Sequence, residues 1–199
     1  MKTFLRKQFD ATHRRQLFVI IVIGSVLGLL FIYLSGSFYK TNTAVLQSQE
    51  QAEIGLPARL KIPTLKADAA IEHLGLTQEG AMDAPKGFEN VAWFNLGPRP
   101  GDKGSAVIAG HRSWINGKAA VFDNLDKLRI GDKLQIITDK GKSVSFVVVK
   151  IRVYDSGADA PEVFASQDGI HLNLVASAGA WDNSKKSATK RLVVFTDAI

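Results

Sequence analysis

The stretch Ser105-Ala-Val-Ile-Ala-Gly-His-Arg112 is a short apolar run that ends in glycine and then in two polar residues. An apolar run of this length, closed by a turn residue, is typical of a buried β-strand. Seven more runs show period-2 alternation or many β-branched residues, and each ends at Gly, Pro, Asp or Asn. The strands we predict are Arg59–Pro63, Ala69–Leu74, Val91–Phe94, Ser105–Ala109, Lys133–Thr138, Ser143–Val153, Leu172–Ala176 and Leu192–Thr196.

One convincing helix is predicted, at Ala119–Leu128. Its apolar residues recur at the spacing of a core-facing helical surface; they are Val121, Phe122, Leu125 and Leu128. Eight short strands with one or two short helices bury their apolar faces best by closing on themselves. We therefore expect a mainly β domain that forms a closed eight-stranded barrel. Since the chain has no cysteine, neither a disulfide nor a thiolate zinc site can hold this domain, and its stability must come from a core.

An apolar segment, centred on Leu17–Leu34, lies before the predicted barrel. Arg15 and Lys40 enclose 24 residues without a charged side chain. A helix of about 20 apolar residues crosses a hydrocarbon core about 30 Å thick, so the segment is predicted to be a transmembrane helix. The alternative is a cleaved signal peptide, with an apolar region of roughly 7–15 residues and a small-x-small cleavage site. Here the segment runs instead into Ser37-Phe-Tyr-Lys40.

The order of the predicted parts follows from this segment. Basic residues gather before it, so we expect the N-terminus in the cytoplasm and the C-terminal domain on the extracellular side of the cell membrane. The regions we predict are a cytoplasmic tail at 1–16, a transmembrane anchor at 17–39, a polar stalk at 40–56 and the folded domain at 57–199.

The charge of the chain is concentrated near its N-terminus. The net charge is +6, but residues 1–40 hold six Lys or Arg and one Asp, which leaves 19 basic and 18 acidic groups in residues 41–199. A nearly neutral domain has no general basic surface to attract phosphates. Nucleic acid is therefore not an expected partner.

The longest predicted loop, Tyr154–Gly169, carries four acidic residues around Pro161. They are Asp155, Asp159, Glu162 and Asp168. Calcium prefers such oxygen ligands, but these acids lack the regular spacing of a calcium-binding loop. We therefore interpret the segment as a solvated loop, and we assign no metal and no cofactor.

Three local patterns place chemically useful residues at strand ends. His111 follows the glycine that closes the first quoted run, Ser177 follows the apolar run Leu172–Ala176, and Arg191 begins the last strand. A histidine can shuttle protons near neutral pH, and an arginine keeps its charge while it offers several hydrogen-bond donors. Taken alone, each residue is also compatible with an ordinary exposed strand end.

In their order along the chain, these residues resemble the sortases, a family of membrane-anchored transpeptidases. The resemblance covers nearly the whole predicted domain. In its spacing and short length, this domain is most similar to the compact class D, E or F groups. Its landmarks are Ile62-Pro63-x-Leu65, Leu74-Gly75-Leu76 with Gly80, Met82-Asp83-x-Pro85, Trp93-Phe94, Pro100-Gly101-x-x-Gly104-Ser105, Gly110-His111-Arg112, Phe122-x-x-Leu125, Gly131-Asp132 and Arg191-Leu192-Val193-Val194.

The resemblance departs from the family pattern at one decisive position. The Thr-Cys-x-Gly stretch of sortases aligns with Ala176-Ser177-Ala178-Gly179, so that Ser177 stands in place of the nucleophilic cysteine. A thiol with a pKa near 8.5 can ionise beside cations, whereas a serine hydroxyl needs a base at hand. Two interpretations stay open: an inactive form that still binds sorting signals, and a serine enzyme with slow acyl transfer.

The resemblance implies catalytic roles for His111, Ser177 and Arg191. The nucleophile would attack a carbonyl of a sorting-signal peptide, His111 would transfer protons, and Arg191 would donate hydrogen bonds to the substrate or the oxyanion. The implied partners are secreted proteins with a C-terminal sorting signal and an amine acceptor, either a peptidoglycan precursor or a pilin lysine. The outcome would be attachment to the cell wall or assembly of pilins.

Other functions fit the same residues less well. The stretch Val175–Gly179 approaches the G-x-S-x-G pattern of α/β-hydrolases, but its first glycine is missing and no histidine follows Ser177. A Ser/Lys peptidase would need Lys185 or Lys186, which have the pattern of exposed turn residues. The non-enzymatic alternative is a membrane-tethered scaffold that binds peptides on a sortase fold.

Overall fold

The structure is a computed structural model that describes residues 28–34, 54–112, 119–166, 168–184 and 187–199. The chain divides into two compact units, residues 1–52 and 53–199. In the first unit, residues 28–34 form an exposed helix. Among the described residues, no helix has both the length and the apolar character needed to cross a membrane. The predicted tail, most of the predicted anchor and nearly all of the predicted stalk lie outside the described residues.

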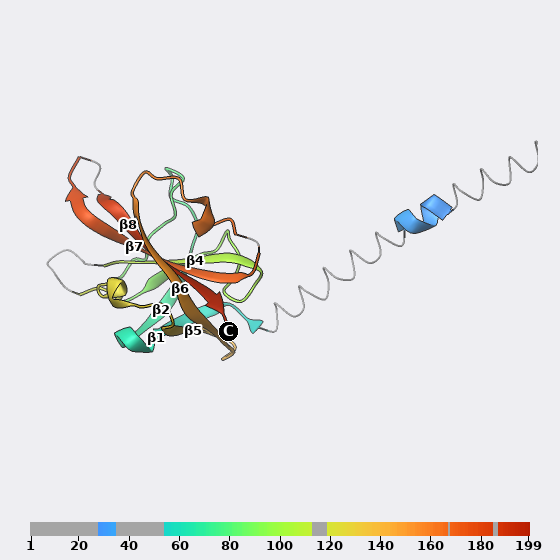
Figure 1. The fold of residues 1–199 in the computed structure, drawn as a ribbon, viewed down its shortest axis with the longest axis horizontal. Coiled ribbons are helices and arrows are strands. Elements are labelled where there is room, and N and C mark those ends of the chain that lie inside the picture. The colour runs from blue at the N-terminus through green and yellow to red at the C-terminus, as the bar shows by residue number, and fades with distance from the viewer. Residues whose placement is uncertain (1–27, 35–53, 113–118, 167, 185–186) are drawn as a thin grey trace, which may run out of the picture. The chain divides into compact units, whose positions relative to one another are not determined.

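The second unit contains a closed barrel of eight strands, in the order β1-β2-β3-β4-β7-β8-β6-β5 (Figure 1). β1 and β5 pair with each other and complete the circle. The predicted closed eight-stranded barrel is thus confirmed. The strands are β1 Pro57–Ile62, β2 Ala67–Leu74, β3 Val91–Phe94, β4 Gly104–Gly110, β5 Lys133–Thr138, β6 Ser143–Asp155, β7 Ile170–Asp182 and β8 Ser187–Ala198.

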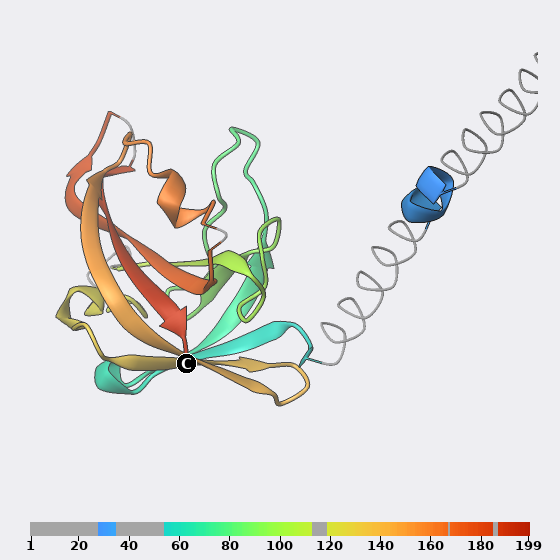
Figure 2. The ribbon, with the colours of Figure 1, turned by 45° about the vertical axis from the view of Figure 1, so that its right-hand side comes forward.

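Most neighbouring strands are antiparallel, but β2 pairs with β3 and β4 pairs with β7 in parallel. β7 and β8 are longer than predicted, with 13 and 12 residues, and their ends run side by side beyond the rest of the barrel (Figure 2). The prediction followed only the apolar cores of these strands. The added length has no continuous apolar pattern, and it is held by cross-strand pairing that reaches Asp182 and Ser187.

The predicted helix at Ala119–Leu128 is wrong in type and extent. Turns lead into a short 3₁₀ helix, η2, at Leu125–Lys127. Two further 3₁₀ helices are η1 at Pro63–Leu65 and η3 at Pro161–Val163. The buried residues Phe122, Leu125 and Leu128 recur every third residue. That period matches the three residues per turn of a 3₁₀ helix, which presents the same face to the core at each turn.

Two hydrophobic clusters form on opposite faces of the same strands. The larger one is the inner core, which includes Phe122, Phe146 and alternate residues of β7. The smaller one, which we call the outer cluster, consists of Val107, Val163 and Val193. Because successive side chains of a strand point to opposite faces, β4 and β8 each contribute residues to both clusters, and Val175 of β7 packs against the outer cluster from the same strand that feeds the inner core. The outer face of these strands is therefore partly covered, and the candidate residues lie at its edge.

Candidate functional site

The sheet brings the three candidate residues to the same end of β4, β7 and β8. Gly110, the last residue of β4, pairs with Ala176 of β7, so His111 and Ser177 are the next residues along two parallel neighbouring strands. Ser177 pairs directly with Arg191 of β8. Side chains of a cross-strand pair lie on the same face, with Cβ atoms roughly 5 Å apart. The structure thus assembles residues that are 80 positions apart in the sequence.

His111 is held by a glycine and by two hydrogen bonds. A Cβ on Gly110 would lie 2.5 Å from the ring of Phe122, so only glycine allows the strand to pass this ring. The Phe122 amide donates to the carbonyl oxygen of His111 at 3.0 Å. The imidazole is half-buried, and its Nε2 lies 2.9 Å from the carbonyl oxygen of Pro85. Because a carbonyl oxygen can only accept, Nε2 donates this hydrogen bond.

Ser177 is exposed and lies two residues before a bulge in β7. The pairing of β7 with β8 shifts between Ala178 and Trp181. Gly179 lies inside this shift with a φ of 74°, a left-handed conformation that favours glycine. Bulges bend a strand locally and are frequent beside functional sites. The Gly179 of the quoted Ala176–Gly179 motif therefore shapes the strand just after the candidate nucleophile.

Arg191 is exposed. Among the residues that the structure describes, no carboxylate forms an ion pair with its guanidinium. On its other side Arg191 pairs with Tyr154 of β6. The row Ser177–Arg191–Tyr154 therefore runs across three neighbouring strands on the outer face. An unpaired cation beside a hydroxyl can stabilise negative charge that develops on a substrate oxygen.

Tyr154 and its partner Glu162 were not among the predicted site residues. The Tyr154 hydroxyl donates to Oε1 of Glu162 at 2.6 Å, and Nη1 of Arg152 lies 3.5 Å from the same oxygen. Burial and this hydrogen bond raise the pKa of Tyr154. The Tyr154 hydroxyl in turn lowers the pKa of Glu162, with smaller contributions from Lys150 and Arg152. The phenol thus stays neutral and the carboxylate ionised.

The loop that carries Glu162 lies over the outer cluster. Its helix η3 buries Val163, and Asn173 of β7 donates from Nδ2 to the Val163 carbonyl oxygen at 2.6 Å. Beside it, Phe94 and Phe164 meet edge to face with 5.9 Å between ring centroids. The loop predicted to be solvated is therefore partly packed, because an apolar residue next to its acids reaches the strands below.

The acids of this loop bond to protein groups. Glu162 accepts from Tyr154, and Asp168 accepts from Nε2 of His171 at 2.9 Å. Within the described ranges, no group of three or more His, Cys, Asp or Glu side chains could hold a metal ion.

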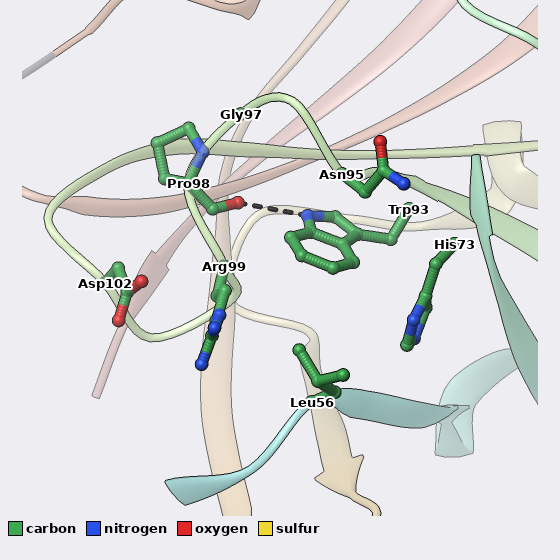
Figure 3. Close-up of a pocket in the computed structure, with 8 residues that line it drawn as sticks. All are labelled: Leu56, His73, Trp93, Asn95, Gly97, Pro98, Arg99 and Asp102. Atoms are coloured by element: carbon green, nitrogen blue, oxygen red, sulfur yellow. Dashed lines mark hydrogen bonds between the residues drawn. The ribbon is translucent and has the colours of Figure 1, made fainter. Parts of the chain in front are cut away.

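A pocket of about 380 Å³ lies at the opposite end of β4 from His111 (Figure 3). It is built around the loop between β3 and β4, where the Trp93 indole donates to the Pro98 carbonyl oxygen at 3.0 Å and meets the His73 ring edge to face. None of the three candidate residues contributes to it. Its lining residues are Leu56, His73, Trp93, Asn95, Gly97, Pro98, Arg99 and Asp102.

Comparison with known proteins shows the family of the chain. The family model described as "Sortase domain" matches residues 60–199. The chain belongs to the sortase family. Family membership supports a transpeptidase of the sortase type at the level of the family. A search of curated proteins gives no match to this sortase.

Solved sortase structures share the fold. A lid mutant of sortase A from Corynebacterium diphtheriae superposes with a TM-score of 0.58 at 22% identity, covering 72% of this chain and 70% of that one. Sortase C-1 from Actinomyces oris gives a TM-score of 0.57 at 21% identity, covering 71% and 73%. These neighbours are of classes A and C, and the similarity to class D, E or F stays a prediction.

Proposed function

We propose that this sortase is a membrane-anchored transpeptidase that cleaves a sorting-signal peptide and joins it to an amine. The observation that carries the proposal is the pairing of Ser177 with Arg191, with His111 next to it at the end of β4. A nucleophile, a proton carrier and a cation on one edge are the groups that acyl transfer needs.

The chemistry follows from these positions. The nucleophile at position 177 passes its proton to His111 and attacks the peptide carbonyl, and Arg191 stabilises the oxygen that gains negative charge. As the carbon–nitrogen bond breaks, His111 gives a proton to the departing amine, and an acyl-enzyme remains. The incoming amine then attacks the acyl-enzyme and forms the new amide bond, while His111 accepts its proton and passes it to the released nucleophile.

Serine at position 177 weakens the first step. Its hydroxyl must lose a proton as it attacks, and we assign His111 as the base that accepts this proton. We therefore expect little or no turnover by the chain with Ser177, together with retained peptide binding. A scaffold that binds sorting signals without turnover is the second candidate, and the same serine favours it.

The predicted anchor and orientation complete the proposal. A helix at 17–39 and a stalk at 40–56 would hold the domain on the extracellular side of the cell membrane, where secreted proteins with a C-terminal sorting signal pass. Tethering the two reactants to one membrane raises their effective concentration. The acceptor would be the amine of a peptidoglycan precursor or of a pilin lysine.

The deciding experiment restores the thiol. We expect the Ser177→Cys protein to form a thioester with a sorting-signal peptide and to transfer it to an added amine, and the Ser177→Cys/His111→Ala protein to lose transfer. Intact mass spectrometry detects both the acyl-enzyme and the product. A matched control is Ser143→Cys, which puts a thiol on an exposed position of β6. A Ser177→Cys protein that binds peptide without ever forming a thioester would establish the scaffold instead.

A further inference from the structure

We propose that Tyr154 is a positioning residue that holds the Glu162 carboxylate away from Arg191 and so keeps the Arg191 charge available to the reaction. The inference rests on the proposed function, because it assigns Arg191 to a developing oxyanion. In the described hydrogen bonds, Tyr154 contacts neither Ser177 nor His111.

The strand register and one hydrogen bond bring Tyr154, Arg191 and Glu162 close together. Tyr154 pairs with Arg191, and Arg152 pairs with Val193 of the outer cluster, so both β6 side chains lie on the outer face. Glu162 reaches both of them, through the 2.6 Å hydrogen bond from Tyr154 and the 3.5 Å contact with Arg152. Its carboxylate is therefore held over β6, one strand from Arg191.

The loop cannot carry Glu162 far from this place. Val163, the next residue, is buried, and its carbonyl oxygen accepts from the buried Asn173. A Glu162 that lost its hydrogen bond to Tyr154 would therefore keep its backbone position and turn its side chain toward other donors. Arg152 would remain one partner. Lys150 also acts on Glu162, and Arg191, directly opposite Tyr154 and in no ion pair with a described carboxylate, is the further cation that the turned side chain would meet.

An ion pair between Glu162 and Arg191 would work against catalysis. A guanidinium that already donates to a carboxylate offers fewer donors and less net charge to an oxyanion. The Tyr154 hydroxyl prevents this because it binds the carboxylate without adding charge. Its own proton stays in place, since burial and Glu162 both raise the pKa of Tyr154.

The activity test uses the Ser177→Cys protein. An exposed ion pair of ordinary strength would occupy Arg191 for most of the time, so Tyr154→Phe is expected to lower kcat roughly three- to sixfold. KM should change little, because the lost interaction forms in the transition state. Adding Glu162→Gln should restore kcat, because the neutral amide cannot form the ion pair. Added salt should reduce the defect of Tyr154→Phe.

The control for the rescue by Glu162→Gln is Asp155→Asn. This change also removes one negative charge, from the residue next to Tyr154 in β6. This change should leave the Tyr154→Phe defect in place. A Tyr154→Phe protein that loses activity through KM, or that Glu162→Gln makes worse, would show that Tyr154 only supports the loop, and would overturn the proposal. Rescue by Asp155→Asn as strong as rescue by Glu162→Gln would overturn it as well, since any loss of negative charge would then suffice.

A second test needs no activity and uses the chain with Ser177. Carbon-13 NMR of labelled glutamate follows the titration of Glu162, whose pKa lies below its ordinary value. In the Tyr154→Phe protein we expect this pKa to stay low because Arg191 becomes a partner, and to rise when Arg191→Gln is added. If Arg191→Gln leaves the pKa of Glu162 unchanged in the Tyr154→Phe protein, the competition does not exist. This result is independent of whether Ser177→Cys gains transpeptidation.

Discussion

The strand pair β7–β8 carries two polar cross-strand pairs, one near the start of β7 and one farther along it, and the two pairs differ in how their charges are satisfied. Near the start of β7, His171 pairs with Asp197, and its Nδ1 lies 2.7 Å from the carboxylate. Asp168 lies at the other ring nitrogen, 2.9 Å away. Farther along the same strands, Ser177 pairs with Arg191, and none of the described carboxylates neutralises this cation. The charges around His171 therefore neutralise one another, whereas the charge of Arg191 stays available to a substrate.

The same backbone arrangement can therefore serve two purposes. At the His171 end, the charged groups hold the β6–β7 loop to β8, which is a structural role. At the Arg191 end, the nearby acid Glu162 is bound by Tyr154 and Arg152 instead. Perturbed or unsatisfied charges in a protein often mark functional sites, although structural networks also perturb them. The comparison predicts that changes at one end alter activity and that changes at the other alter stability.

The largest effect is expected where the reactive end rests on the inner core. Phe122 is fully buried, lies against Gly110 and donates its amide hydrogen to His111. Phe122→Ala should lower the free energy of unfolding by about 3–5 kcal/mol, because it leaves a cavity in the core. Urea unfolding followed by fluorescence measures this change. Phe164→Ala, at a side chain that is 46% exposed, is the control and should cost clearly less. Equal losses would show that Phe122 gives no special support.

The next prediction tests whether Arg191 itself, and not positive charge in general, assists the reaction. In the Ser177→Cys protein, Arg191→Gln should lower kcat about 10²- to 10³-fold, the usual loss when one donor to an oxyanion is removed. Lys190→Gln removes the same charge one residue away, from a side chain on the opposite face of β8. In single-turnover kinetics, the rate of the Lys190→Gln protein should stay within about twofold of the rate of the Ser177→Cys parent. Similar losses in both variants would mean that general positive charge, rather than Arg191, assists the reaction.

Much of the fold was predictable because strand runs and turn residues are local signals. The closed barrel follows from eight such runs, and two strands, Val91–Phe94 and Lys133–Thr138, have the predicted bounds. The signal failed where pairing, and not a continuous apolar pattern, extends a strand, as at the far ends of β7 and β8. It failed again at 119–128, where a spacing of three was interpreted as an α-helical face.

The candidate site was predictable only in part. His111, Ser177 and Arg191 were found from ordered motifs, and the register shows that they lie together. Tyr154 and Glu162 were missed because their role depends on which strand lies opposite which. Tyr154 had been placed at the start of a loop, whereas β6 continues to Asp155 and pairs it with Arg191. A strand prediction extended by two residues would have supplied the signal for Tyr154, but its pairing with Arg191 needs the closed topology.

The smallest effect tests the closed end of the comparison through pH. Burial alone lowers the pKa of His171, but the hydrogen bonds with Asp197 and Asp168 outweigh it and leave the pKa raised. Bonds from Ser166 and then His171 lower the pKa of Asp168, so this acid stays ionised from neutral to mildly acidic pH. A raised histidine pKa stabilises the fold fully below the unfolded value near 6.5, and this contribution is lost as the pH rises through the folded pKa. The urea concentration at which the parent unfolds should therefore fall between pH 6 and pH 9. The His171→Gln protein should already be less stable than the parent at pH 6 and should not show this fall. In the Ser177→Cys background His171→Gln should leave kcat unchanged at a given pH. A pH-independent difference between the two proteins would mean that His171 stabilises the loop by packing and not by its charge.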